Sequence, residues 1–262
     1  MKEIELENIE EAQSHLLLAK IGKRVLRPGG KELTKQLVES LHVTKEDVIA
    51  EFAPGSGFTA ELVLQKHPKE YIGIDREKVH IENLKERFKE ENIKIIEGNA
   101  EATGLPNESV DKVYGEAMLS MHHNIRKARI IKEAARILKK GGYYAIHELE
   151  LNLTKVEHEK EAEIQKELAH VSHVNARPQT LEEWTELLAN EGFKVIEVKR
   201  KPLRVLEPAR MIDDEGFFHT LHIAYNVLSN RKIRKRVFEM RRTFNKHEKF
   251  LNAVMILAVK EK

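Results

Sequence analysis

Residues Val48 to Ala60 read VIAEFAPGSGFTA, an apolar run that leads through an acid into a glycine turn and the start of a helix. We expect a buried strand at the apolar run and a tight turn at Gly55 and Gly57. A strand, a glycine turn and a helix N-terminus in this order bring backbone N–H groups close to a bound ligand. The two glycines let the backbone approach it without a Cβ in the way. The stretch therefore predicts a ligand site at the turn.

A second apolar run, Tyr71 to Ile74, ends in the acid Asp75, some twenty residues after the turn. In a parallel sheet this carboxylate would lie at the carboxyl end of the neighbouring strand, within reach of a ribose. The two segments together predict a site for a nucleoside-containing ligand.

Two interpretations compete for the turn. Gly55 to Ala60 fits G-x-G-x-x-A, the dinucleotide fingerprint of NAD enzymes. The turn also resembles motif I of the class I S-adenosylmethionine-dependent methyltransferases, an acid-x-G-x-G-x-G pattern. Glu51 is then the acid, Ala53 replaces the first glycine, and Gly55 and Gly57 are the second and third. A carboxylate at Glu51 suits the cationic methionine end of that cofactor, whereas it would repel a pyrophosphate. We therefore favour the methyltransferase interpretation.

Composition bounds the remaining choices. The chain has 262 residues, of which 41% are hydrophobic, enough for a sizeable buried core. It contains no cysteine, which excludes disulfides, thiolate metal sites and cysteine nucleophiles. The net charge is only +2, so nothing global indicates nucleic acid. With no run of eighteen apolar residues and no signal-peptide pattern, we expect no transmembrane segment and a cytoplasmic protein.

Strand and helix signals alternate along the chain from residue 48 onward. Such alternation predicts βαβ units and a parallel sheet whose carboxyl ends share one edge. We expect strands at 48–50, 70–75, 93–97, 110–115, 143–149, 195–205 and 250–260, and helices at 5–21, 31–42, 77–91, 127–139, 155–173, 181–193 and 208–247. Gly141 and Gly142 are expected to cap the helix before the fifth strand, and Thr180 with Glu183 predicts a capping box. As domains we expect a helical cap at 1–45 and a methyltransferase domain at 46–262, with helical insertions at about 151–179 and 207–247.

Later segments add to the family resemblance. Ile96 to Glu101 is similar to the adenine-binding motif after the third strand, with Asn99 and Ala100 at the contact positions. Ile131 to Gly142 is similar to the family's E-x-x-R-x-L-K-P-G-G helix and turn, and Trp184 to Phe193 resembles the helix before the closing strands. The nearest subgroup is the small-molecule methyltransferases similar to those of ubiquinone and menaquinone biosynthesis (methyltransferase type 11).

This resemblance implies an α/β fold: a Rossmann-like seven-stranded sheet with helices on both faces and the last strand antiparallel, plus N-terminal helices and helical lid insertions. It implies S-adenosyl-L-methionine as cofactor and S-adenosyl-L-homocysteine as product. Asp75 would bind the ribose hydroxyls, and Glu51 with the turn backbone would hold the methionine end. The full set of cofactor residues expected from the resemblance is Glu51, Ala53, Gly55, Gly57, Asp75, Arg76, Asn99, Ala100 and Glu116.

The acceptor is expected to bind beside the strand ends and the inserted helices. Methyl transfer is an in-line displacement that needs an aligned nucleophile, and a poor nucleophile also needs a base. His122, His123 and His147 directly follow strands and are the candidates for a base or an orienting group. The expected lining of a histidine-rich substrate pocket is Arg27, Met121, Glu148, His170, His173, Phe218, His219 and His222.

Several of these residues have alternative interpretations. Arg27 to Gly30 is either a turn between helices or a loop that closes over the ligand's carboxylate. The histidines are either ordinary pocket or surface imidazoles, or a base, or ligands of a metal. We expect no metal, and the alternative is a centre built from His170, His173, His219 and His222.

The partner is expected to be a small-molecule acceptor, with a homodimer also compatible with the sequence. The basic run Arg231 to Arg236 is a solvated helix face in the plainest interpretation, or a patch for nucleic acid or a membrane surface. The residues after the fourth strand, Gly115 to Met118, lack the Asn/Asp-Pro-Pro-aromatic motif of base methylation, so we expect no nucleic acid. A non-catalytic module that binds S-adenosylmethionine is the remaining alternative.

Overall fold

Seven strands form one mixed sheet in the order β3-β2-β1-β4-β5-β7-β6. The structure is a computed structural model that describes residues 8–25, 27–153, 158–203 and 206–261. β7 runs antiparallel to both β5 and β6, and the other pairs are parallel. The strands are β1 (Val48–Phe52), β2 (Glu70–Asp75), β3 (Ile93–Glu97), β4 (Val110–Glu116), β5 (Leu138–Leu151), β6 (Phe193–Pro202) and β7 (Leu251–Lys260). The expected Rossmann-like sheet with an antiparallel last strand is confirmed.

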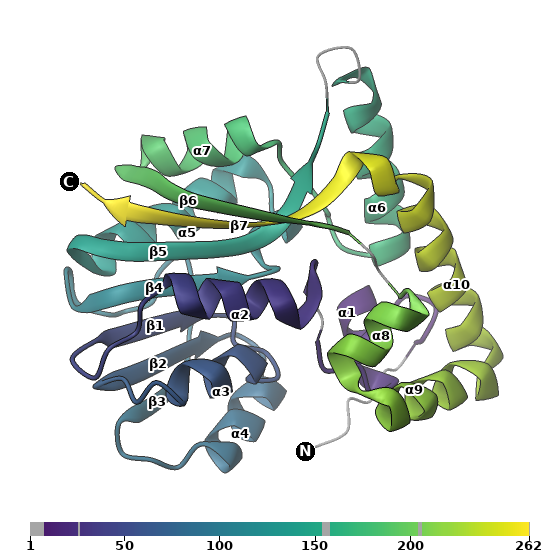
Figure 1. The fold of residues 1–262 in the computed structure, drawn as a ribbon, viewed down its shortest axis with the longest axis horizontal. Helices are drawn as coiled ribbons and strands as arrows, with labels where there is room; N and C mark the ends of the chain where they lie inside the picture. The colour runs from purple at the N-terminus through teal and green to yellow at the C-terminus, as the bar shows by residue number, and fades with distance from the viewer. Residues whose placement is uncertain (1–7, 26, 154–157, 204–205, 262) are drawn as a thin grey trace.

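Helices cover both faces of this sheet (Figure 1). On one face lie α2 (Gly30–Ser40), α3 (Phe58–Leu64) and α4 (Lys78–Arg87), whose apolar sides join the sheet in one buried cluster. On the other face lie α5 (Asn124–Ile137) and α7 (Leu181–Asn190), which share a second cluster with the sheet. Burial of these two apolar faces drives the three-layer packing.

Five further helices form a lobe beyond the carboxyl ends of the parallel strands (Figure 1). We call this group the helical lobe: α1 (Ser14–Lys20), α6 (Glu161–Ser172), α8 (Pro208–Glu215), α9 (Phe217–Ser229) and α10 (Arg231–Lys246). It has its own apolar core, to which all five helices contribute: Leu17, Ile21, Val171, Met211, Ile223, Val227, Ile233, Val237 and Met240. The N-terminal segment and the two later insertions therefore pack as one unit over the edge where the site was expected.

Three short 3₁₀ turns complete the description: η1 (Leu119–Met121), η2 (His158–Lys160) and η3 (Glu248–Phe250). The capping box at Thr180 and Glu183 is present in both directions, as predicted. α10 has a buried face formed by Ile233, Arg236, Val237 and Met240. Arg236, which was expected on the solvated face, is instead buried and donates to the Glu10 carbonyl at 2.5 Å.

Some predicted boundaries are wrong. The helix expected at 5–21 is confined to α1, with residues 8–13 in turns and bends and residues 1–7 outside the described residues. Gly141 and Gly142 do not cap a helix, because α5 already ends at Ile137 and Leu138 is extended. The two glycines lie instead where β5 bulges against β4, and a Cβ at Gly142 would lie 2.8 Å from the carbonyl oxygen of Asp111. β6 ends at Pro202, and part of the strand expected up to residue 205 lies outside the described residues.

Candidate cofactor and acceptor site

The glycine turn after β1 is built from left-handed backbone conformations. Ala53, Gly55 and Gly57 have φ values of 56°, 57° and 77°. Gly57 also has no room for a side chain, since a Cβ there would lie 2.5 Å from Leu84 Cδ2. Ala53 holds a conformation that costs a non-glycine residue about 1–2 kcal/mol, and its N–H donates to the Ile74 carbonyl at 2.8 Å. Ala53 thus takes a left-handed conformation that a glycine would adopt without this cost.

Asp75 joins the end of β2 to this turn. Its Oδ2 accepts the Gly55 N–H at 3.0 Å, and its Oδ1 accepts the Glu77 N–H at 3.0 Å. His80 Nδ1 lies 3.4 Å from Oδ2. Burial by itself would raise the pKa of Asp75, but His80 and the two N–H groups lower it below its usual range. Asp75 is therefore an ionised carboxylate held beside the glycine turn.

Glu51 is buried within the sheet next to the turn. Its Oε2 accepts hydrogen bonds from the hydroxyls of Tyr71 and Tyr114, the latter at 2.6 Å. Burial raises the pKa of Glu51 to about 7, although the two phenols and Arg27 oppose this rise. Close to neutral pH this side chain is therefore poised between its neutral and its ionised form.

Glu116, the last residue of β4, is the centre of a buried charged cluster. It accepts hydrogen bonds from Thr34 at 2.6 Å and from Thr59 at 2.5 Å, and Arg27 Nε lies 3.2 Å from its Oε2. Burial alone would raise the pKa of Glu116, but Arg27 and His147 lower it to about 2. A carboxylate at the end of β4 thus fixes the loop before α2, the start of α3 and the strand β5.

His147 is fully buried and uses both ring nitrogens. Nδ1 lies 2.7 Å from Glu116 Oε2, and Nε2 is hydrogen-bonded to the Pro28 carbonyl. Both neighbours are acceptors, so both ring nitrogens donate only in the imidazolium form. No ring nitrogen is left for an acceptor molecule, and this geometry argues against the predicted role of His147 as a general base.

The other two histidines predicted as bases lie outside the cavity described below. His122 is half-buried, and burial together with the charge of Arg126 lowers its pKa to about 4. His123 is exposed at the N-cap of α5, with its Nε2 2.6 Å from Asn175 Nδ2. Neither belongs to the residues that line the cavity.

The remaining expected cofactor residues lie at the ends of β2 and β3. Arg76 follows Asp75 and is exposed. Asn99 is exposed just after β3, and its Oδ1 accepts the Glu101 N–H at 3.1 Å, while Ala100 is buried. The turn is therefore prefolded, with the Asn99 side chain at the surface beside the strand that ends in Asp75.

A cavity of about 160 Å³ lies between the sheet edge and the helical lobe. Its sheet side is formed by the loop Arg27 to Gly30 and by residues that follow β4, such as Ala117 and Met121. Its lobe side is largely apolar, with side chains such as Leu18, Leu168, Met211 and Met240. The polar residues of the whole lining are Ser14, His15, Lys23, Arg27, Ser120, Glu148, Ser172, Arg210 and Asp214. The cavity is thus continuous with the Glu116 cluster through Arg27 and Pro28.

Three of the eight predicted pocket residues line this cavity: Arg27, Met121 and Glu148. Glu148 is fully buried and accepts three backbone N–H groups, from Met118, Leu119 and Ser120. These three bonds hold the turn after β4, so the Glu148 carboxylate serves this turn and not a ligand.

The other five predicted pocket residues do not line this cavity. His170 and His173 are exposed at the end of α6, where His173 is the left-handed C-cap residue. Phe218 is 83% exposed, His222 is exposed, and His219 bonds the Gly22 carbonyl at 2.7 Å. These side chains project from helices whose opposite faces form the lobe core, so helical spacing alone did not reveal which face would be inward.

Sequence reasoning missed His15, the histidine that does line the cavity. It lies on α1, and its buried Nδ1 has no hydrogen-bond partner. Burial lowers the pKa of His15, and the nearby His80 lowers it further. His15 and Leu18 lie three residues apart and both line the cavity, a helical spacing that was visible in the sequence.

A metal centre is not supported by the arrangement of the histidines. Among the described residues, no three His, Cys, Asp or Glu side chains are placed to hold a metal ion. The two pairs that suggested one have ring centroids 6.5 Å apart for His170 and His173, and 6.1 Å apart for His219 and His222. In the described part of the chain, the four histidines of the metal alternative therefore do not come together as one ligand set.

Residues 50–146 match a family of methyltransferase domains. This span runs from β1 to β5 and includes the glycine turn, Asp75 and Glu116. This part of the chain is a methyltransferase domain, and the seven-stranded sheet around it is the Rossmann-like fold of the class I S-adenosylmethionine-dependent methyltransferases.

Relatives of this methyltransferase agree with that assignment. An uncharacterized protein of Haemophilus influenzae is 29% identical over 252 residues, which cover 94% of this chain and 97% of that protein. The ubiquinone/menaquinone biosynthesis C-methyltransferase UbiE of Campylobacter jejuni is 31% identical over 123 residues, 43% of this chain and 49% of UbiE. The likeness to UbiE thus covers about half of that enzyme.

Solved structures share the fold of this methyltransferase. The phosphoethanolamine N-methyltransferase 2 of Haemonchus contortus, in complex with phosphomonomethylethanolamine and S-adenosylhomocysteine, superposes with a TM-score of 0.70 at 14% identity. The match covers 95% of this chain and 58% of that enzyme. None of the helices in the described ranges has the length and apolar character needed to cross a bilayer.

Proposed function

We propose that this methyltransferase transfers the methyl group of S-adenosylmethionine to a small molecule bound in the cavity between the sheet edge and the helical lobe. The observation that carries the proposal is Arg27, which joins the Glu116 cluster at the strand ends to the lining of the cavity. UbiE is named for ubiquinone and menaquinone biosynthesis, and the Haemonchus contortus enzyme was solved with phosphomonomethylethanolamine. These names support a small-molecule acceptor.

The residues at the strand ends fit the cofactor. Asp75 is ionised beside the glycine turn, where a ribose would donate its hydroxyls to the carboxylate. The buried Nη1 of Arg27 has no hydrogen-bond partner, so it can donate to the methionine carboxylate. Glu51 would favour the methionine ammonium, and Asn99 with the Ala100 N–H would contact the adenine edge. S-adenosylmethionine would supply an activated methyl group bound to a sulfonium.

Residues of the cavity would align the acceptor and exclude water. With S-adenosylmethionine bound, the nucleophilic atom of the acceptor would form the new bond to the methyl carbon as the carbon–sulfur bond broke, and the electron pair of that bond would stay on sulfur. Alignment of the reacting atoms can supply roughly 7–11 kcal/mol of the barrier reduction. His15 Nδ1 lines the cavity without a partner and is the group we assign to orient the acceptor or to take its proton.

Calorimetric titration with S-adenosylmethionine, S-adenosylhomocysteine, NAD and NADP tests the cofactor. A ligand at a hundred times its dissociation constant should stabilise the fold by about 2.7 kcal/mol, which thermal unfolding detects. We expect the two sulfur nucleosides to bind and Asp75→Asn to weaken both. Asp213→Asn, at an exposed carboxylate of α8, is the matched control and should bind normally. Binding of NAD alone, or of none of the four, would refute the proposal.

A further inference from the structure

Two guanidinium groups in the cavity each hold a buried N–H group that no acceptor of the protein reaches. These are Nη1 of Arg27 and Nη2 of Arg210, and both side chains line the cavity. Arg27 is 10% exposed and Arg210 is 20% exposed. Unpaired buried donors on a charged group are unfavourable, so the cavity is built to complement acceptor atoms of a ligand.

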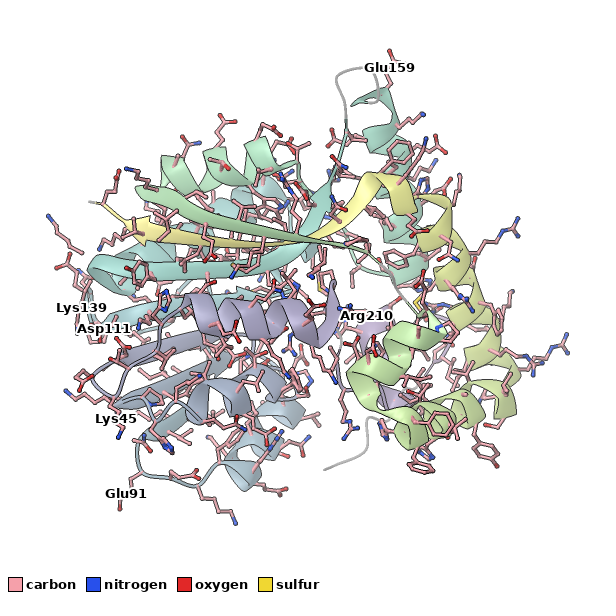
Figure 2. The ribbon with its side chains drawn as sticks, viewed as in Figure 1. Lys45, Glu91, Asp111, Lys139, Glu159 and Arg210 are labelled. Carbon is pink, nitrogen blue, oxygen red and sulfur yellow. The ribbon has the colours of Figure 1, made fainter. Side chains whose placement is uncertain are left out.

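The free N–H of Arg210 is held in place by its surroundings. Arg210 Nε lies 3.5 Å from Asp214 Oδ2, and Asp214 Oδ1 accepts the Lys31 N–H at 2.9 Å. A Cβ at Gly30 would lie 2.4 Å from Nη2, so only a glycine leaves room for the guanidinium here. Figure 2 shows Arg210 at the junction of α8 with the start of α2. The group is therefore preorganised rather than free to rotate.

The charges around Arg210 favour an anion. Lys23 also lines the cavity, with its Nζ 3.9 Å from Asp214 and 3.6 Å from Glu215. Glu215 is turned to the backbone, where it accepts the N–H groups of Arg24 and Val25. Asp214 is shared by Lys23 and Arg210, and Glu215 is shared by Lys23 and Arg24. Three cationic side chains thus face two carboxylates, which leaves this end with one net positive charge.

The rest of the lobe wall is apolar. It is formed by side chains such as Leu168, Val174, Leu203, Met211, Met240 and Phe244. The cavity volume of about 160 Å³ is close to the roughly 150 Å³ of an apolar cavity that accommodates benzene. A ring or a short hydrocarbon chain therefore fits beside the cationic end.

We propose that Arg210 and Lys23 bind a carboxylate or phosphate group of the methyl acceptor, whose hydrocarbon part packs against the apolar wall. This inference rests on the proposed function, because that function assigns Arg27 to the methionine carboxylate and leaves Arg210 for the acceptor. The acceptor is then an amphipathic anion. Its charged group points toward α8, and its methyl-accepting atom points toward Ala117 at the end of β4.

Three aromatic probes of nearly equal shape test the charge preference. We would measure dissociation constants of benzoate, phenyl phosphate and the neutral benzamide by saturation-transfer NMR, on the full chain saturated with S-adenosylhomocysteine. At least one anion should bind about tenfold more tightly than benzamide, and the better of the two identifies carboxylate or phosphate. Equal binding of all three would overturn the proposal.

Variants tie the preference to Arg210. Arg210→Gln should abolish the tenfold preference, whereas Arg242→Gln, which removes the same charge from an exposed position on α10, should keep it. Retention of the preference in Arg210→Gln would overturn the assignment. If thermal unfolding shows that Arg210→Gln does not fold, Lys23→Gln tests the second cation. We expect a weaker preference for the anion in Lys23→Gln, and an unchanged preference would count against the proposal.

The same samples separate this inference from the proposed function. Arg210→Gln should bind S-adenosylhomocysteine with unchanged affinity, because Arg210 lies on the acceptor side. If the wild type binds S-adenosylhomocysteine but shows no anion preference, the subsite is refuted and the proposed function stands. If the wild type prefers anions but does not bind S-adenosylhomocysteine, the proposed function fails while the anion subsite remains supported.

Discussion

The Nε atom of Arg27 lies 3.2 Å from Oε2 of Glu116, in the same cluster in which His147 Nδ1 lies 2.7 Å from that oxygen. One buried carboxylate at the end of β4 thus holds two side chains from different segments, the guanidinium of Arg27 and the imidazole of His147. Arg27 also lines the cavity, and its buried Nη1 has no hydrogen-bond partner. Through this contact the sheet edge determines the position of the loop that closes one wall of the proposed acceptor site.

Loss of the Glu116 charge should strongly destabilise the fold. Glu116→Gln leaves the Arg27 guanidinium buried without its counter-ion and removes the carboxylate partner of His147. Removal of one partner of a buried ion pair typically costs about 3–5 kcal/mol. Urea unfolding at pH 7 measures this. Glu61→Gln serves as control, because Glu61 pairs with Arg87 at the surface, where such pairs contribute about 0–1 kcal/mol. A loss below 1 kcal/mol for Glu116→Gln would contradict the role of the cluster.

The folded-state pKa of Glu51 predicts a distinct pH dependence. Burial raises this pKa from 4.5 to about 7, so the folded state binds the proton more tightly than the unfolded state. The associated stability is present below about pH 4.5 and is lost as the pH rises through 7, by an amount up to about 3 kcal/mol. Unfolding free energies between pH 4.5 and 8 should therefore fall more steeply in the wild type than in Glu51→Gln. Parallel curves for the two proteins would rule out the raised pKa.

A glycine at position 53 should stabilise the chain. Ala53 has a φ of 56°, and relief of its left-handed conformation outweighs the entropy cost of glycine, for a gain of about 0.5–1 kcal/mol. Ala53→Val should be destabilising, since a β-branched side chain tolerates positive φ poorly. As a control, Ala224→Gly in the exposed face of α9 should cost about 1 kcal/mol. Thermal unfolding of the three variants measures the change in stability, which should be a gain for Ala53→Gly and a loss for Ala53→Val and Ala224→Gly.

His15 should affect turnover rather than cofactor binding. His15→Gln removes the unpartnered imidazole from the cavity, and loss of a general base typically lowers kcat by about 10²–10⁴-fold. The affinity for S-adenosylhomocysteine should stay unchanged. His170→Gln, at an exposed position of α6, should leave both quantities unchanged. Once an acceptor is known, normal kcat in His15→Gln would remove His15 from the reaction.

The sequence by itself determined the sheet and the location of the cofactor turn. The strand, the glycines and the helix start of Val48 to Ala60 are close in sequence, and hydrophobic periodicity reports such local structure directly. The position of Asp75 beside the glycine turn was predicted in the same way, since parallel strands end at one edge of the sheet. Even the departure at Ala53 was visible as a missing glycine, and its left-handed backbone in the structure explains why glycine suits this position.

Only the tertiary structure decided which side chains meet in the acceptor cavity. His15 on α1, Lys23 in the segment after α1 and Arg210 on α8 all line the cavity, and packing of the lobe core decided which faces of α1 and α8 point into it. His147 was predicted as a base or orienting group, but it lies within β5, where Glu116 and the Pro28 carbonyl hold it in the interior. Contacts between segments far apart in the chain leave no local periodicity, so the partner of a buried charge cannot be read from its neighbours in sequence.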